Sequence, residues 1–181
     1  MEQESAAIYT LVSADNGMCD MRLFGRPEKS ILTVCAANVC RSPMAEGIFR
    51  EELRRLGLHR KIRVDSAGTH ATQAGRRADP RALRVCADQG INLSGCRARQ
   101  VKEEDFGRFD YLLAMDRRNE QWLLEHSPEP YRGRISLLAS WAPGAGPEEI
   151  PDPYYGNQAG FDQVLSMLNA AVQGFLLQLR E

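Results

Sequence analysis

Apolar residues along the chain follow two alternating patterns. Short runs rich in aliphatic residues predict β-strands at 31–34, 61–66, 110–115 and 135–138. Apolar residues at three- and four-residue steps predict helices at 43–56, 80–89, 102–106, 119–126 and 160–180. Strands that alternate with helices favour an α/β fold, in which a parallel sheet has helices on both faces.

The last predicted helix has the longest apolar stripe. Residues at helical spacing are expected to face the core: Phe161, Val164, Leu165, Leu168, Ala171, Val172, Phe175 and Leu179. Residues 31–181 are therefore expected to form one domain, as the length of 181 residues also suggests. Residues 1–30 are expected to be a loosely held extension without an assigned role. A hairpin of 8–12 and 18–24 around the Asp-Asn-Gly turn signal at 15–17 is the alternative.

Composition narrows the function classes. With 43% hydrophobic and 26% charged residues, the chain is typical of a soluble globular protein, and a net charge of -1 argues against nucleic-acid binding. We expect no membrane span, because no apolar run reaches about 18 residues, and we expect a cytoplasmic protein. Five cysteines do not suggest a secreted disulfide framework, and the three histidines lack zinc-like spacing with a cysteine pair. No metal or cofactor is expected.

The most informative stretch is the junction between the first predicted strand and the first helix. Cys35 ends the strand, and Pro43 is expected at the first position of the helix. The loop between them, Ala36 to Ser42, should bind an anion, because the free amides at a helix N-terminus point toward it. Those amides and Arg41 would also favour the thiolate form of Cys35.

Arg41 and Ser42 suit nucleophilic chemistry on a phosphate ester. The planar guanidinium of Arg41 can bind phosphate oxygens in pairs, and the Ser42 hydroxyl can donate a hydrogen bond to the sulfur. The structural alternative is that Cys35 only fills space at the end of a core strand, as free cysteines often do.

The segment resembles the signature loop of the low-molecular-weight protein tyrosine phosphatases, Val-Cys-x-Gly-Asn-x-Cys-Arg-Ser-Pro. The matching positions are Val34, Cys35, Asn38, Cys40, Arg41, Ser42 and Pro43. Three further blocks follow in the family's order: Asp-Ser-Ala-Gly-Thr at 65–69, Ala-Met-Asp at 114–116 and Asp-Pro-Tyr-Tyr at 152–155. The resemblance covers about 31–181. It implies a three-layer fold with a four-stranded parallel sheet, and hydrolysis of phosphotyrosine through a cysteinyl-phosphate.

The same resemblance implies roles outside the loop. Asp152, stiffened by a proline on each side, would be the general acid, and Tyr154 and Tyr155 would flank the pocket mouth. Without the resemblance, Asp152 would be taken as an ordinary loop aspartate. Asn38, Ser66 and Asp116 would support the loop, although a turn or helix-cap role for Ser66 and Asp116 is equally compatible with the sequence.

This chain departs from the family pattern at three positions. Ala37 replaces a glycine, which would be costly only if its φ is positive. Thr72 stands in the region where relatives place an aromatic pocket wall, so stacking would depend more on Tyr154. Cys96 stands where relatives often have a histidine that contacts the loop asparagine. Cys40 is expected to form a protective disulfide with Cys35 on oxidation, or else to be a buried small residue.

Two other functions remain open from the sequence. An arsenate reductase shares this loop and uses a thiol relay, for which Cys86 and Cys96 are available. A non-catalytic phosphate-binding module would need neither Cys35 nor Asp152. The expected partner is a phosphotyrosine-containing protein. Resemblance to bacterial members suggests a tyrosine kinase as that partner, and a host protein is the alternative.

Overall fold

The computed structural model describes residues 28–144 and 148–179. Its four strands and five α-helices occur in the predicted order, and two short 3₁₀ helices are additional. In chain order the elements are β1 (Lys29–Cys35), α1 (Arg41–Arg55), β2 (Ile62–Gly68), α2 (Pro80–Asp88), α3 (Glu103–Arg108), β3 (Tyr111–Ala114), α4 (Arg117–His126), η1 (Glu129–Arg134), β4 (Ile135–Leu137), η2 (Leu138–Trp141) and α5 (Gln158–Gln178).

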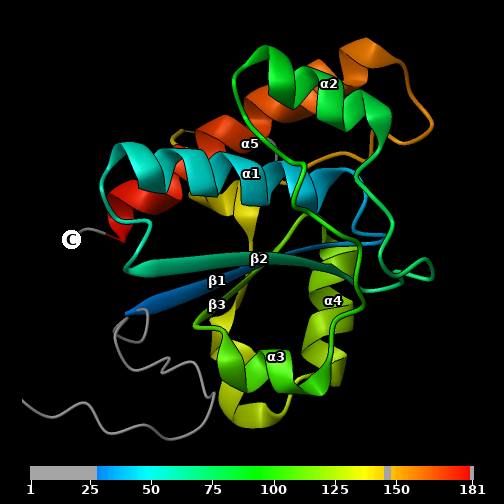
Figure 1. Ribbon diagram of the computed structural model, residues 1–181. Coiled ribbons are helices and arrows are strands. Elements are labelled where there is room, and N and C mark those ends of the chain that lie inside the picture. The colour runs from blue at the N-terminus through cyan, green and yellow to red at the C-terminus, as the bar shows by residue number, and fades with distance from the viewer. Residues whose placement is uncertain (1–27, 145–147, 180–181) are drawn as a thin grey trace, which may run out of the picture.

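The four strands form one parallel sheet in the order β2-β1-β3-β4. Helices α1, α2 and α5 cover one face, and α3 and α4 cover the other (Figure 1). The prediction of a three-layer α/β fold with a four-stranded parallel sheet is confirmed. The strands end at one edge of the sheet, where β1 leads into α1, and this is the edge at which ligands bind in such folds.

Two hydrophobic clusters hold the layers together. The larger lies between the sheet and α1, α2 and α5, and the smaller between the sheet and α3 and α4. The predicted apolar stripe of α5 is buried, except for Leu179, which is half-buried. Because both faces of the sheet are covered, β3 is a continuous apolar run rather than an alternating one.

The bounds of β1 and α1 differ from the predicted ones. Strand β1 begins at Lys29 because Lys29 and Ser30 already pair with β2, and Ser30 binds Asp110 through its amide and its hydroxyl. Helix α1 begins at Arg41, so Pro43 lies inside the first turn rather than at its start. Proline is accepted there because the first helical amides have no partner within the helix.

The extension or hairpin expected in residues 1–30 falls outside the described residues as far as residue 27. Among the helices that the structure describes, none is both long enough and apolar enough to cross a membrane.

Candidate active site

The loop between β1 and α1 forms a cradle of amides. Three of its carbonyls are held from outside: Cys35 accepts from the Thr69 amide at 2.9 Å, Ala36 from His70 at 2.8 Å and Val39 from Asp79 at 2.8 Å. In a trans peptide the N–H points opposite to the carbonyl. The amides that follow these carbonyls therefore point into the loop, where an anion would be bound.

Asn38 gives the loop its shape. Its φ of 56° is the one positive value among the non-glycine residues of the described chain. Its side-chain amide donates to Ser42 and Ser66, each at 2.9 Å, and its side-chain oxygen accepts from the Arg99 amide at 2.9 Å. These bonds compensate for the left-handed backbone, which asparagine tolerates better than most residues.

Gly68 lets the loop approach β2 closely. A Cβ atom at this position would lie 2.5 Å from the Ala36 carbonyl oxygen and 3.0 Å from the Asn38 nitrogen. Ala37, in contrast, does not have a positive φ. The alanine that replaces the family's glycine therefore brings no strain of that kind.

The sulfur of Cys35 lies at the centre of the loop and is almost fully buried. The Asn38 amide donates to it at 3.3 Å, and the Ser42 hydroxyl lies 3.0 Å away. Ser42 also accepts a bond from Asn38, and its hydroxyl proton has two acceptors within reach, the sulfur at 3.0 Å and the Ala67 carbonyl at 3.3 Å. Donors around the sulfur stabilise a negative charge on it.

Arg41 lies beside the loop and joins it to two other segments. Its guanidinium donates to Asp116 at 2.6 Å, to the Ile150 carbonyl at 3.0 Å and to Asp152 at 2.9 Å. Burial opposes the positive charge, but Cys35 and the two carboxylates outweigh it, and the pKa of Arg41 is raised. Arg41 therefore stays charged.

Asp116 has both roles that the sequence allowed. It braces Arg41, and its other oxygen caps α4 by accepting from the Asn119 amide at 2.8 Å. Ser66 likewise supports Asn38, as described above, rather than forming a local turn.

Asp152 approaches the loop from the segment before α5. Its side chain is 48% exposed, and its second oxygen accepts from the Tyr154 amide at 3.0 Å. Arg81 of α2 holds this segment by donating to the carbonyls of Tyr154 and Gly156, each at 2.9 Å. Asp152 is thus fixed near the loop while it stays open to solvent.

A pocket of about 220 Å³ opens at this place. Its lining combines the loop with the Asp152 segment: Cys35, Ala37, Val39, Cys40, Arg41, Asp152, Tyr154 and Tyr155. Tyr155 is 97% exposed and packs edge-on against Tyr154. Thr72, which the sequence suggested as a wall, is exposed and not part of this lining. The described residues contain no group of three metal-ligating side chains.

The other buried cysteines differ from Cys35 in their surroundings. Burial and the carboxylate of Asp79 raise the pKa of Cys40 to about 12, and burial with Glu46 raises that of Cys96 to about 12. Both are therefore neutral thiols at neutral pH. Cys35, Cys40, Cys86 and Cys96 are free.

The sequence reasoning missed three residues that support the site. Glu46 is buried in α1 and accepts from the Ser66 hydroxyl at 2.5 Å. Arg99 supplies the amide for Asn38, and Arg81 braces the Asp152 segment. Of these three residues, only Glu46 had a signal in the sequence, because it is a charged residue in the first turns of a helix that is expected to be buried. Cys96 lies against Glu46, so it acts on Asn38 only indirectly.

Known proteins resemble this chain in sequence and in fold. A family model described as low molecular weight phosphotyrosine protein phosphatase matches residues 30–181. A putative low molecular weight protein-tyrosine-phosphatase of Synechocystis is 39% identical over 82% of this chain and 95% of its own length. The human low molecular weight phosphotyrosine protein phosphatase is 38% identical over 82% and 94%. A crystal structure of a protein tyrosine phosphatase from Entamoeba histolytica superposes with a TM-score of 0.81 at 35% identity, covering 84% of this chain and 97% of that one.

Proposed function

The chain belongs to the low molecular weight phosphotyrosine protein phosphatase family and hydrolyses phosphotyrosine, and we propose that Cys35 is its nucleophile, Arg41 its phosphate clamp and Asp152 its general acid. One observation supports these roles above the others. Arg41 contacts Asp152 at 2.9 Å, and both line the same pocket as Cys35. Nucleophile, cation and acid thus line one pocket, whose volume of about 220 Å³ leaves room for a phosphate group.

In the first step, the Cys35 thiolate attacks phosphorus, and the bond from phosphorus to the tyrosyl oxygen breaks. The loop amides and Arg41 bind the three remaining oxygens, whose charge is spread in the transition state. The tyrosyl oxygen leaves with the proton of Asp152. Because a phosphate dianion competes with Asp152 for Arg41, substrate binding frees this half-exposed carboxyl to carry a proton.

In the second step, water hydrolyses the cysteinyl-phosphate. Asp152, now ionised, takes a proton from the attacking water, and the bond between sulfur and phosphorus breaks. The Ser42 hydroxyl, 3.0 Å from the sulfur, stabilises the thiolate as it leaves. Inorganic phosphate is then released.

The pocket mouth suits an aromatic phosphate ester. Tyr154 is 39% exposed and is held from behind by Arg81, whose guanidinium lies 5.8 Å from the centre of its ring. A fixed aromatic wall can stack on the ring of phosphotyrosine. Tyr155 adds a second, more exposed ring, and Thr72 contributes less.

Substitution of the thiol tests the central role. Cys35→Ser should abolish turnover of p-nitrophenyl phosphate and of a phosphotyrosyl peptide, whereas Cys86→Ser, a buried cysteine outside the pocket, should keep it. Full activity of Cys35→Ser would contradict the assignment. Thioredoxin-coupled reduction of arsenate, measured in parallel, should stay at background, because a thiol relay is not part of the proposed mechanism.

We also propose that Cys40 protects Cys35 during oxidation. Peroxide would convert the Cys35 thiolate to a sulfenic acid with release of water or hydroxide, and the Cys40 thiol would then displace water to form a disulfide. Both cysteines line the same pocket. Activity lost to peroxide should return with dithiothreitol in the native chain but not in Cys40→Ser, and equal recovery in both would overturn this role.

The proposed location is the cytoplasm, because a mechanism that needs a reduced thiol at Cys35 suits a reducing compartment. For the partner, the family supports a phosphotyrosine-containing protein, and the finer proposal is a bacterial tyrosine kinase, based on the resemblance to bacterial members. The kinase proposal would be supported if the enzyme dephosphorylated an autophosphorylated tyrosine kinase faster than a free phosphotyrosyl peptide. Equal rates for the two substrates would count against it.

A further inference from the structure

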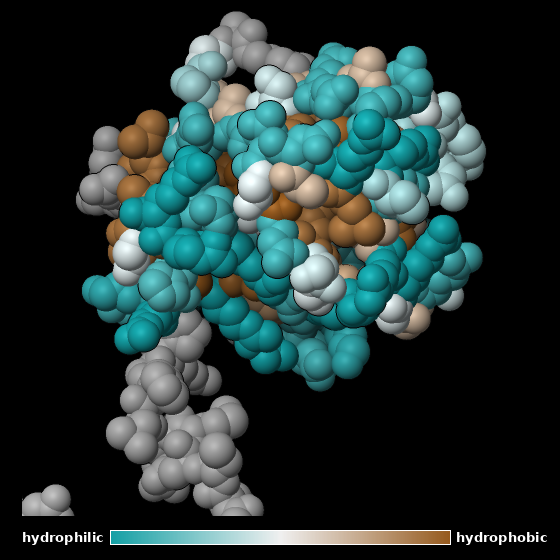
Figure 2. Space-filling view, turned by 45° about the horizontal axis from the view of Figure 1, so that its top comes forward, coloured by the Kyte–Doolittle hydropathy of each residue, from teal (hydrophilic) through white to brown (hydrophobic). Residues whose placement is uncertain are grey.

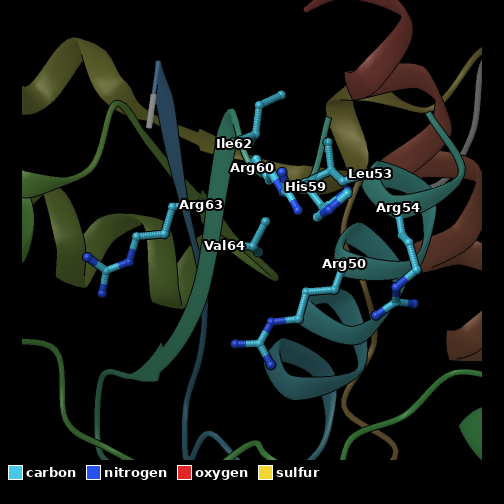
Figure 3. A pocket seen from close by; sticks show the side chains of 8 residues that line it. All are labelled: Arg50, Leu53, Arg54, His59, Arg60, Ile62, Arg63 and Val64. Carbon is cyan, nitrogen blue, oxygen red and sulfur yellow. The ribbon is translucent and has the colours of Figure 1, made fainter. Parts of the chain in front are cut away.

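A second hollow lies on the surface between α1 and β2. It encloses about 440 Å³ and takes its lining from α1, from β2 and from the turn between them: Arg50, Leu53, Arg54, His59, Arg60, Ile62, Arg63 and Val64 (Figure 3). We call it the basic groove. It is twice the volume of the catalytic pocket, and it shares no residue with that pocket.

The basic groove is at the end of the sheet opposite to the active site. Ile62 begins β2 and pairs with Lys29, whereas Gly68 ends β2 and pairs with Cys35. The six residue steps along β1 from Lys29 to Cys35 span about 20 Å, at roughly 3.3 Å per residue. A ligand in the groove would therefore not overlap with a phosphate ester at Cys35.

The rim of the groove is positive. Its lining includes four arginines and no carboxylate, and Arg50, Arg54 and Arg60 lie on the groove's side of β2 (Figure 3). Arg63 projects from the other side of the strand, where it lies over the Phe109 ring and 3.9 Å from Asp65. Arg50 pairs with Glu46, which is 3% exposed, so its negative charge does not face the groove. Arg54 pairs with Glu51 at the surface, where a pair contributes little and is readily exchanged. Arg60 has no carboxylate partner among the described residues.

The floor of the groove is apolar and next to an open strand edge. Leu53, Ile62 and Val64 are buried, and Figure 3 shows them between β2 and α1, among the side chains of Arg50, Arg54 and Arg60. Strand β2 is the edge of the sheet and pairs with β1. In the part of the chain that the structure describes, its outer side is paired only at Gly68, which bridges to Gln100.

We propose that the basic groove binds an acidic, extended segment of the phosphotyrosine protein on which the enzyme acts. The proposal rests on the proposed function for the identity of the partner. Carboxylates of the segment would face the arginine rim, and its apolar side chains would cover the floor of Leu53, Ile62 and Val64. Because side chains alternate along an extended chain, a segment lying along β2 can present every second residue to the floor.

The apolar floor beside the basic rim favours an acidic peptide over a small anion as the ligand. The groove combines a basic rim with apolar surface, whereas the catalytic loop would bind an anion with converging amides. In Figure 2, where the top of Figure 1 is turned toward the viewer, hydrophobic surface is visible among hydrophilic side chains. The competing explanation is that arginines on an edge strand only prevent pairing between sheets. The experiments below separate the two explanations.

The first experiment measures binding without catalysis. The probe is a fluorescein-labelled, unphosphorylated peptide, Glu-Asp-Ile-Glu-Val-Asp-Glu, and its neutral match replaces each acid by the corresponding amide. Fluorescence anisotropy should detect the acidic peptide only, with affinity that falls as ionic strength rises. The double variant Arg54→Glu, Arg60→Glu should weaken binding at least about tenfold, since rim charges turn from attractive to repulsive. Arg50 stays unchanged because its partner Glu46 reaches the catalytic loop.

Arg132→Glu is the matched control. Arg132 is exposed in η1, next to β4 at the opposite edge of the sheet, and it should leave binding unchanged. No binding of the acidic peptide, or an equal loss in Arg132→Glu, would overturn the proposal. A groove that bound inorganic pyrophosphate but not the acidic peptide would also overturn the proposal, because it would then be a site for a small anion.

The second experiment connects the groove to catalysis. A phosphotyrosine is joined to the same acidic or neutral segment through eight glycine and serine residues, which can span the length of β1, about 20 Å. The acidic tail should lower KM several-fold in the native chain without raising kcat, and the double variant should lose this advantage. The native chain and the double variant should hydrolyse p-nitrophenyl phosphate, which has no tail, at equal rates. If neither hydrolysed any phosphate ester, the proposed function would fail while the peptide-binding result would still stand.

Discussion

The chemistry of the site depends on how one guanidinium is shared. Arg41 binds Asp116, the Ile150 carbonyl and Asp152, and it lies beside the Cys35 sulfur. Asp116 is less exposed than Asp152, at 19% against 48%. A substrate phosphate would therefore displace Asp152 rather than Asp116, which keeps Arg41 in place while it frees the acid.

The role of Asp152 predicts a dependence on the leaving group. Asp152→Asn keeps the size of the side chain but has no proton to give, and kcat for phenyl phosphate should fall by about 10²–10⁴. For 2,4-dinitrophenyl phosphate, whose leaving oxygen needs little protonation, the loss should be far smaller. Steady-state kinetics with both esters measures the difference. A loss of equal size for the two would show that Asp152 acts on binding rather than as an acid.

Glu46 predicts a dependence of stability on pH. Burial raises the pKa of its carboxyl, although the Ser66 hydroxyl and Arg50 favour the charged form. With the folded pKa above the unfolded one, the contribution of Glu46 is greatest in acid and falls as pH rises through the folded value. Glu46→Gln cannot ionise, so its Tm relative to the native chain should improve from acid to neutral pH. A relative Tm that worsens would mean that the charged form is preferred.

The residues adjacent to Cys35 in sequence were predictable, and those brought to it by folding were not. Cys35, Arg41 and Ser42 belong to one loop, and its pattern could be recognised in the sequence. The Arg99 amide reaches Asn38 from 61 positions away, and Glu46 reaches it through Ser66. No periodic pattern in the sequence predicts these two contacts, because they arise from the packing of β2 and the loop that follows it against α1.

Helix α5 and the short η2 are so close that no side chain fits between them at their point of contact. Gly174 lies at the contact, and a Cβ atom there would be 1.8 Å from the Trp141 carbonyl oxygen. This carbonyl belongs to the backbone, so it cannot rotate away as a side chain would. The close approach lets the Trp141 ring reach Phe175, with ring centres 4.8 Å apart.

Gly174→Ala should therefore destabilise the fold. Alanine is the better helix former, yet the forced separation of α5 and η2 should cost about 1–3 kcal/mol, typical of overpacking. Urea unfolding measures the change. Gly95→Ala is the control, because no atom lies within 4 Å of the added carbon and φ is not positive. Gly174→Ala that is as stable as the control would contradict the contact.

The regular elements were predictable because their burial is periodic, and the irregular ones were not. The apolar stripe of α5 and the continuous run of β3 follow from which faces meet the core. The 3₁₀ helices η1 and η2 carry no comparable pattern, since they have only six and four residues and η1 buries none of them. Helix ends also shifted by about two residues, which is the normal scale of such differences.

At the scale of the molecule, the parallel sheet separates two surfaces. The carboxyl ends of the strands carry the catalytic loop, and the start of β2 carries the basic groove. Strand β1 runs between them from Lys29 to Cys35 and pairs with β2 and β3 on its two sides. The order of the strands places β1 between β2 and β3, so the proposed nucleophile ends a strand that is paired on both sides.

We propose that the chain from β1 onward is the catalytic domain. The family model begins at residue 30, and β1 is paired from Lys29. Deletion of residues 1–27 should therefore leave kcat and KM for p-nitrophenyl phosphate unchanged. Circular dichroism of the shortened chain checks that it is folded. A folded but inactive shortened chain would show that the extension takes part in catalysis.

The most direct test of the mechanism is to isolate the covalent intermediate. A phosphotyrosyl peptide labelled with ³²P is mixed with the enzyme and quenched within one turnover, and the labelled residue is identified by mass spectrometry. The native chain should carry phosphate on Cys35, and Asp152→Ala should accumulate more of it with esters of good leaving groups, because no base activates the water. Label on another residue, or burst-phase release of phosphate without any labelled protein, would contradict the cysteinyl-phosphate mechanism.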